Sequence, residues 1–133
     1  LLTSLVSGNL SYSTVGGFTK PISESGKIGG TVTSTNITIG NASGVPKLVN
    51  YSTALTDAVG RNWVGNLTAA QSLASFQTGG AKNLSVSCSG AYASTGTGNA
   101  QGVVIGKATP VGMISSYQMN AGTASVVGAV LSR

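Results

Sequence analysis

Apolar and polar residues alternate along most of this chain, which is the pattern of β-strands with one buried face. The run Thr31–Ile39 is β-branched almost throughout and is the clearest predicted strand. From residue 84 onward the same alternation predicts four more strands, separated by clusters of Gly, Ser, Thr and Asn that predict turns. These strands are Leu84–Ala93, Gly102–Ala108, Val111–Met119 and Ala124–Leu131.

Two stretches follow a helical spacing instead. Tyr51, Leu55 and Val59 recur every four residues, and apolar residues of Leu67–Phe76 fall on one helical face. We therefore expect one or two short helices in the middle of the chain. Trp63 lies between them, and we expect it to pack into the core, with a stacking platform for carbohydrate as the alternative.

The spacing of the predicted strands indicates the fold class. About seven or eight short strands separated by turn signals are typical of an immunoglobulin-like β-sandwich. The composition is uniform, and 133 residues are enough for one domain. We expect a mainly β protein, with an N-terminal strand in residues 1–12 that can be donated to a neighbour, and a single β-sandwich domain in residues 13–133.

The scarcity of charge excludes many kinds of active site. Only 7% of residues are charged, and there is no His. The only acidic side chains are Glu24 and Asp57, which lie far apart in sequence, and Cys88 is the only Cys. A Ser–His–Asp or Cys–His site and an intramolecular disulfide are therefore impossible within these residues. We expect no enzymatic activity, no cofactor and no metal site, and we expect Cys88 to be a small buried residue of a strand.

The basic residues are few and dispersed. The net charge is +5, but the bases do not cluster as they do where a protein follows phosphates. We therefore expect no nucleic-acid partner. With two carboxylates there is also little to titrate between neutral and strongly acidic pH, which fits an acidic exterior. The basic residues are Lys20, Lys27, Lys47, Arg61, Lys82, Lys107 and Arg133.

Asparagine stands unusually often in the acceptor sequence for N-glycosylation. Six of the nine Asn residues are followed by any residue except Pro and then by Ser or Thr. The chain contains 34 Ser and Thr, so chance gives about two such sites. We interpret the excess as a glycosylated surface of a secreted protein, against the alternative of polar turn residues in a Ser/Thr-rich chain. The predicted acceptors are Asn9, Asn36, Asn41, Asn50, Asn66 and Asn83.

The first residues form a short apolar segment. Four of the first six residues are large and apolar, and Gly8 follows shortly after them. The segment is too short to span a membrane, and no stretch reaches the length that spanning requires. We expect a secreted chain whose signal peptide has been removed and which has no integral membrane segment. The candidate polymerisation residues are Leu1, Leu2, Leu5 and Val6.

The glycine-rich run Gly96–Gly102 has a spacing loosely similar to a phosphate-binding loop. No helix pattern and no acidic residue follow it where a dinucleotide site would need them. A turn explains this run better, and we predict a turn over Ser94–Ala100.

These features together resemble those of extracellular filament subunits of thermoacidophilic archaea. The resemblance rests on the apolar N-terminal segment, the Ser/Thr/Gly-rich β-segments, the many acceptor sequences and the lack of charge. Thread-type subunits are similar to bacterial chaperone–usher pilins, in which a neighbour's N-terminal strand completes an incomplete immunoglobulin-like sandwich. The resemblance implies a cell-surface pilus or thread that acts in adhesion and grows as a head-to-tail homopolymer by strand complementation.

Other functions are also compatible with the sequence. A virion coat or spike protein can use a small β-sandwich, and the globular part of a type IV-like archaeal pilin can have a similar composition. The type IV pattern needs a long apolar N-terminal helix, whereas here the apolar run ends at Ser7 and Gly8. A monomeric carbohydrate-binding module would need more aromatic residues than the 5% found here.

Overall fold

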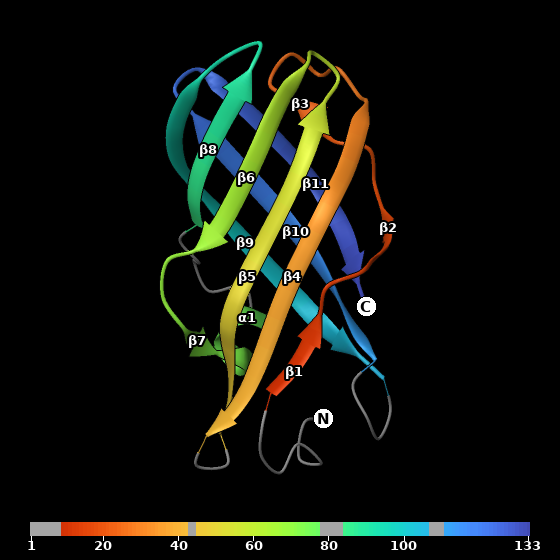
Figure 1. Cartoon of the computed structure of the whole chain (residues 1–133), viewed down its shortest axis with the longest axis vertical. Helices are drawn as coiled ribbons and strands as arrows, with labels where there is room; N and C mark the ends of the chain where they lie inside the picture. Colours follow the sequence, from red (N-terminus) through yellow and green to blue (C-terminus); the bar gives the residue numbers. More distant parts are fainter. Residues whose placement is uncertain (1–8, 43–44, 78–83, 107–110) are drawn as a thin grey trace.

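The computed structural model describes residues 9–42, 45–77, 84–106 and 111–133 (Figure 1). Within these ranges the chain is mainly β, with a single short helix, which confirms the predicted class. The elements in chain order are β1 (Asn9–Tyr12), β2 (Val15–Phe18), β3 (Ile22–Ser23), β4 (Gly30–Ala42), β5 (Val45–Asp57), β6 (Arg61–Leu67), β7 (Gln71–Ser72), α1 (Leu73–Gln77), β8 (Leu84–Gly90), β9 (Ser94–Ile105), β10 (Gly112–Ala121) and β11 (Ala124–Ser132).

The strands pair as one continuous antiparallel sheet. Its order is β1-β4-β5-β6-β8-β9-β10-β11-β2, while β3 pairs with β11 and β7 pairs with β5. From β4 to β11, each long strand therefore lies beside the next long strand in the chain. An immunoglobulin-like sandwich divides its strands between two sheets. The continuous pairing does not confirm that finer expectation.

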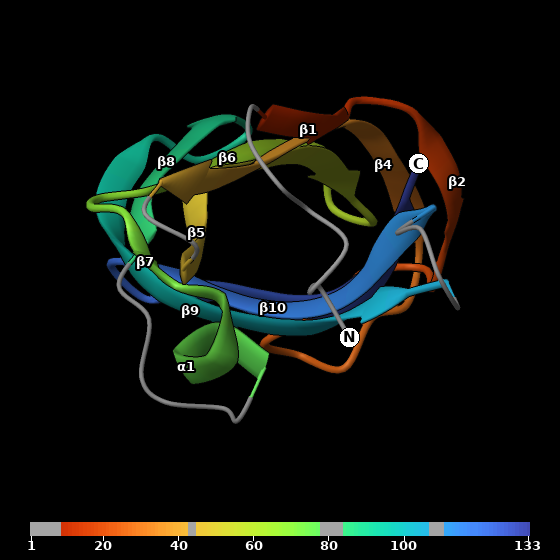
Figure 2. The same ribbon diagram turned by 90° about the horizontal axis from the view of Figure 1, so that it is seen from below.

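The N-terminal residues join the two ends of the curled sheet. β1 pairs with β4 and β2 pairs with β11, and only Ser13 and Thr14 separate β1 from β2. Thr14 and Arg133 exchange backbone hydrogen bonds of 2.9 and 2.8 Å, which extend the pairing of β2 with β11. Inside, the Thr35 and Ser132 hydroxyls lie 2.7 Å apart and link β4 to β11. Residues 9–18 thus cross from one end of the sheet to the other (Figure 2).

The curled sheet has two walls that enclose the core. We call β1, β4, β5, β6 and β8 the front wall, and β9, β10, β11, β2 and β3 the back wall (Figures 1 and 2). Tyr51 of the front wall and Ser115 of the back wall share a buried hydrogen bond of 2.9 Å across the core. The largest fully buried side chains fill the space between the walls and beside α1; they include Trp63, Tyr51, Phe76, Ile37, Ile39, Leu48, Met113 and Met119.

The predicted helix over Tyr51–Val59 is wrong, because these residues continue β5 as far as Asp57. A spacing of four residues fits one turn of helix, but it also fits two repeats of a strand. Here Tyr51 and Leu55 face the core together with Thr53, which shows the strand period. The second predicted helix is confirmed only over Leu73–Gln77.

Trp63 and Cys88 are buried as predicted, on β6 and β8. Their Cα atoms are directly paired in register between the two strands. Because Trp63 is fully buried, it cannot be a surface platform for carbohydrate.

The glycine-rich run 94–100 is part of strand β9, so the predicted turn is wrong. Glycine is needed there because β9 lies very close to the backbone of β10. A Cβ added at Gly98 would overlap the carbonyl oxygen of Gln118, and one at Gly102 would lie 2.6 Å from the carbonyl oxygen of Ile114. These glycines therefore serve strand packing rather than chain reversal.

Candidate functional site

Both acidic side chains of the protein meet at one arginine. Asp57 ends β5 and Arg61 begins β6, so the short turn between these strands brings the two residues together. Arg61 Nε donates to Asp57 Oδ2 at 2.6 Å, and the two guanidinium NH groups donate to the Glu24 carboxylate at 2.9 and 3.1 Å. The Trp63 indole donates to Asp57 at 2.9 Å. We call these four residues the charge cluster.

The charge cluster also ties the two walls together. The backbone N–H of Ser125, in β11, donates to Glu24 at 3.1 Å, while Arg61 belongs to β6. The backbone N–H groups of Val59 and Arg61 both donate to Asp57 Oδ1 at 3.0 Å and shape the turn between β5 and β6. Glu24 thus bridges the back wall to the front wall near the turn that joins β5 to β6.

The electrostatics keep both carboxylates ionised. Hydrogen bonds from Arg61 lower the pKa of Glu24 to about 2, although its side chain is 40% exposed. Burial opposes ionisation of Asp57, but hydrogen bonds from Trp63, Arg61 and Val59 outweigh it and lower its pKa. With its acids held as anions and paired, the cluster is suited to a structural role and not to proton transfer.

Sequence reasoning missed this cluster. Glu24 and Arg61 are 37 residues apart, and nothing in the local sequence connects them. The composition did contain one indication. The chain has only two acidic side chains, so a charge buried at Asp57 or Arg61 has few possible partners of opposite charge. Asp57 and Arg61 take buried positions in the strands that they end and begin, each two residues from a buried apolar residue, Leu55 and Trp63 respectively.

The predicted glycosylation sites gather on the front wall. Asn9 lies in β1, Asn36 and Asn41 in β4, Asn50 in β5 and Asn66 in β6. No predicted site lies in β2, β3, β9, β10 or β11. Asn83, the candidate residues Leu1, Leu2, Leu5 and Val6, and Lys82 and Lys107 lie outside the described residues.

The acceptor sequence matches the period of a strand, which explains why it recurs. In a strand, the Asn and the Ser or Thr two residues later share one face of the sheet, while the residue between them points to the other face. Ile37, Tyr51 and Leu84 are such middle residues, and each is fully buried. Leu10 and Leu67 take the same position and pack against the core while partly exposed.

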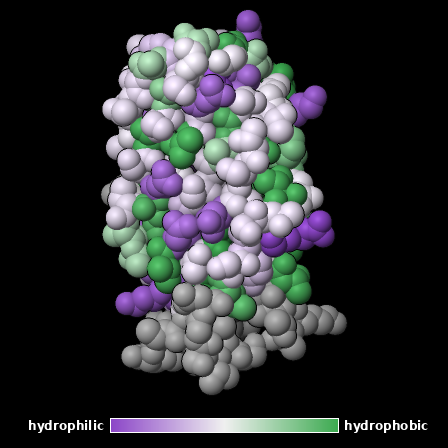
Figure 3. Space-filling view, viewed as in Figure 1, coloured by the Kyte–Doolittle hydropathy of each residue, from purple (hydrophilic) through white to green (hydrophobic). Residues whose placement is uncertain are grey.

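Two of the acceptors form a row across the front wall. Asn36 and Asn66 are both exposed and stand on either side of Ser52 in the register of β4, β5 and β6. Two strand spacings put them about 10 Å apart. Asn50 lies in the next row, opposite Thr38; it is half-buried, and its amide nitrogen is 3.5 Å from the Asn36 carbonyl oxygen. Figure 3, which looks onto this wall, shows mostly residues of near-neutral hydropathy.

The outer face of the back wall has a different chemistry. None of its five strands contains a charged residue. Four large apolar side chains there are 37–48% exposed: Ile22, Val103, Ile114 and Val127. Phe18, opposite the buried Val130 on the edge strand β2, is also 41% exposed. On the front wall only Val49 and Val64 among the described residues are comparable.

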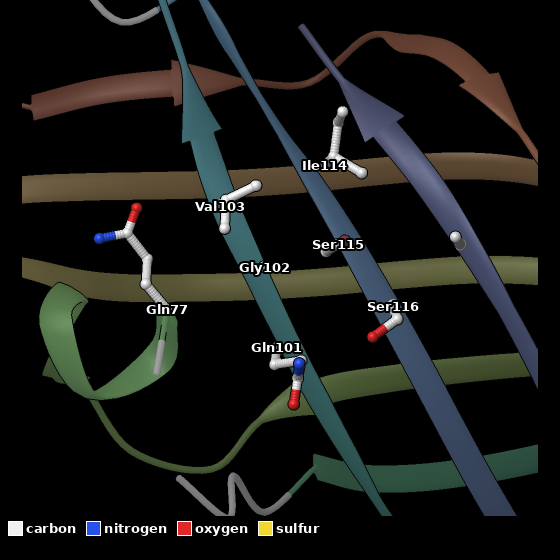
Figure 4. Close-up of a pocket in the computed structure, with 8 residues that line it drawn as sticks. Gln77, Gln101, Gly102, Val103, Ile114, Ser115 and Ser116 are labelled. Carbon is white, nitrogen blue, oxygen red and sulfur yellow. The ribbon is translucent and has the colours of Figure 1, made fainter. Parts of the chain in front are cut away.

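Two shallow hollows meet on the back wall. One, of about 200 Å³, lies beside α1 and is lined by Gln77, Gln101, Val103 and Ile114 among others (Figure 4). The second, of about 190 Å³, shares Ile114 and Ala129 with the first and extends to Phe18. Their linings contain no titratable side chain. Such a surface suits contact with another neutral surface better than chemistry on a substrate.

β9 has an edge without a strand partner in the described part of the chain. β8 pairs with β9 only as far as Gly98, whereas β10 pairs with it to Ile105. Beside this stretch lies α1, and the Val104 N–H donates to the Gln77 side-chain oxygen at 3.1 Å. Backbone groups alternate in direction along a strand, so the N–H and C=O of Gly102 point the same way as those of Val104, away from β10 and toward the edge that lacks a strand partner.

Other chemistry finds little support in the described residues. Burial raises the pKa of the Cys88 thiol, which makes it a weak nucleophile. Within the described ranges, no three His, Cys, Asp or Glu residues stand close enough to hold a metal ion. No helix in those ranges is long and apolar enough to cross a membrane.

Comparison with known proteins adds no relative, since no family model, no curated protein and no solved structure matches this chain.

Proposed function

We propose that this protein is a structural subunit of a glycosylated extracellular filament, a pilus or thread, with adhesion as its role. One subunit would complete the sheet of the next through β-strand pairing, with main-chain hydrogen bonds and apolar side chains contributing together. The curled sheet would take the place that an incomplete immunoglobulin-like sandwich was expected to take.

The observation that carries this proposal is the edge of β9. Residues 101–105 have β10 on one side and no strand on the other within the described ranges. Proteins usually guard such an edge with charge, Pro or a covering element. β9 contains no charged residue. Instead α1 lies beside this edge, and the Gln77 side-chain oxygen accepts a hydrogen bond from the Val104 N–H.

The apolar N-terminal segment is our candidate for the added strand. Leu1, Leu2, Leu5 and Val6 would each contribute roughly 1.5–3 kcal/mol if fully buried in a neighbour. A head-to-tail contact of this kind does not close on itself, so it would grow a fibre.

Electron microscopy of the purified protein tests the proposal, with a chain lacking residues 1–8 as the comparison. We expect fibres from the full chain and none from the shortened chain. A synthetic peptide of residues 1–8 should raise the melting temperature of the shortened chain, while a peptide of the same composition in scrambled order should not. Identical fibres from both chains would show that this segment is not the donor, and a full chain that never polymerises would overturn the filament function.

Intact-mass measurement tests the glycans. The chain alone has a mass of 13.1 kDa, and we expect protein from its native source to be heavier by several glycans. A measured mass equal to that of the bare chain would contradict the glycosylated surface.

A further inference from the structure

The two walls differ in where a bulky modification can stand. Every predicted acceptor within the described residues lies in β1, β4, β5 or β6, and none lies on the back wall. An N-glycan is bulky and hydrophilic, so it prevents close packing of the surface that carries it. An assembly of modified subunits therefore has the back wall as its broad face for close contact.

The back wall also has the chemistry of a contact face. Its exposed side chains are apolar residues, amides and hydroxyls, and its strands carry no charge. In register, Val103, Ile114 and Leu131 form one row across β9, β10 and β11. Exposed apolar side chains gathered in this way mark interaction surfaces.

We propose that the back wall binds the back wall of a second copy of this chain, so that the glycosylated front walls face outward. The proposal deepens the proposed function and rests on it for the setting, since it names the lateral contact of an assembling subunit. It is separate from the β9 edge, because it uses the outer face of the strands and not their backbone groups.

The partner follows from charge and area. A strongly charged partner would lose hydration of its charges against a face that offers no counter-charge. The same face of a second copy presents only neutral groups, and two-fold symmetry places equal patches together. The ten residues of β10 span about 33 Å and four strands about 19 Å, which gives roughly 600 Å² per copy. Two such faces reach the lower end of the size of specific interfaces.

A glycan placed on the back wall tests this contact. Ile114→Asn creates an acceptor sequence with Ser115 and Ser116 in the middle of the face, and Ile114 is 46% exposed. The matched control is Ala54→Asn, which creates an acceptor with Leu55 and Thr56 on the front wall. Both variants are secreted from a yeast host, and intact mass and circular dichroism verify the added glycan and the fold.

A third variant separates the glycan from the change in polarity. Ile114→Asn combined with Ser116→Ala carries the same Asn without an acceptor sequence, so it receives no glycan there. Sedimentation equilibrium measures self-association, and electron microscopy shows how fibres lie against one another. We expect the unmodified chain and Ala54→Asn to associate equally, the double variant to associate about tenfold more weakly, and glycosylated Ile114→Asn to show no lateral association.

The outcomes separate this inference from the proposed function. Fibres that still pair side by side in glycosylated Ile114→Asn would overturn the back-wall contact and leave the filament function standing. Dimers without fibres, lost in Ile114→Asn, would support the contact and overturn the filament. Loss of the contact on removal of residues 1–8 would assign the face to that segment and overturn the face-to-face pairing. A chain that is monomeric at every concentration would overturn both.

Discussion

The two walls of this sheet are made of the same kinds of residue but arrange them differently. The front wall holds the five predicted glycan acceptors that lie in described residues, and it holds both Asp57 and Arg61 beside the turn between β5 and β6. The back wall has no charge in its strands and exposes five large apolar side chains. In a chain with only 7% charged residues, hydroxyl and amide groups make up most of the polar side chains. The comparison shows that the predicted acceptor sequences and the uncharged, apolar surface lie on different faces of one sheet, and our proposal of a contact face rests on that difference.

Besides the strand pairing, three side-chain contacts among the described residues link the walls, and each can be tested by substitution. The charge cluster joins them through Glu24, near the turn between β5 and β6. The Tyr51–Ser115 hydrogen bond joins them through the core, and the Thr35–Ser132 hydrogen bond joins β4 to β11.

Arg61→Met should destabilise the protein most. It leaves the Asp57 carboxylate buried without its charged partner, and breaking a buried ion pair in this way costs about 3–5 kcal/mol. Urea unfolding followed by circular dichroism measures the change. Lys47→Met is the matched control, because Lys47 is exposed on β5 and has no salt bridge to a described residue. Equal stability of the two variants would show that the cluster does not hold the walls together.

Gly102→Ala should distort the back wall. Its Cβ would lie 2.6 Å from the Ile114 carbonyl oxygen, and such overpacking costs typically about 1–3 kcal/mol. Gly17→Ala is the control, because a Cβ there meets nothing within 4 Å. The free energy of unfolding of both variants gives the answer. A Gly102→Ala variant as stable as Gly17→Ala would mean that β9 and β10 are not so closely packed.

Tyr51→Phe should weaken the link through the core by roughly 1–2 kcal/mol. The change removes one partner of the 2.9 Å hydrogen bond and leaves the buried Ser115 hydroxyl without it. A double-mutant cycle with Ser115→Ala isolates the interaction, and the double variant should lose less than the sum of the single variants. Additive losses would show that the two hydroxyls do not interact.

Acid should have the smallest effect, confined to the charge cluster. The folded pKa of Glu24 is about 2, below its ordinary value of 4.5. Its contribution to stability is therefore complete above about pH 4.5 and is lost as the pH falls toward 2, and the lowered pKa of Asp57 acts in the same direction. The exposure of the Glu24 side chain keeps the loss small.

The urea midpoint measured from pH 7 to pH 2 checks this expectation. We expect a constant midpoint down to about pH 5 and a modest fall below it, which Glu24→Gln should reduce. The sequence alone predicted almost no dependence on acid, and the cluster limits the exception to one site. A large fall above pH 5 would contradict both statements, since no described carboxylate titrates there.

Local properties of this protein could be predicted from its amino-acid pattern. Alternation made the mainly β class predictable, because a strand with one buried face needs apolar residues at every second position. The same reasoning predicted that Trp63 and Cys88 are buried, and the absence of His excluded a Ser–His–Asp or Cys–His site within these residues. Where a pattern fits two periods, local reasoning failed: a spacing of four residues gave Tyr51–Val59 the appearance of a helix.

Contacts between distant residues could be found only from the folded chain. It joined Glu24 to Arg61 across 37 residues, made one curled sheet out of strands expected in a sandwich, and placed the glycine run of β9 against β10. It also put the predicted acceptors of the described ranges on the front wall and most of the exposed large apolar strand residues on the back wall. Strand pairing and the curl of a sheet depend on the packing of the whole core, so their result is absent from any short stretch of sequence.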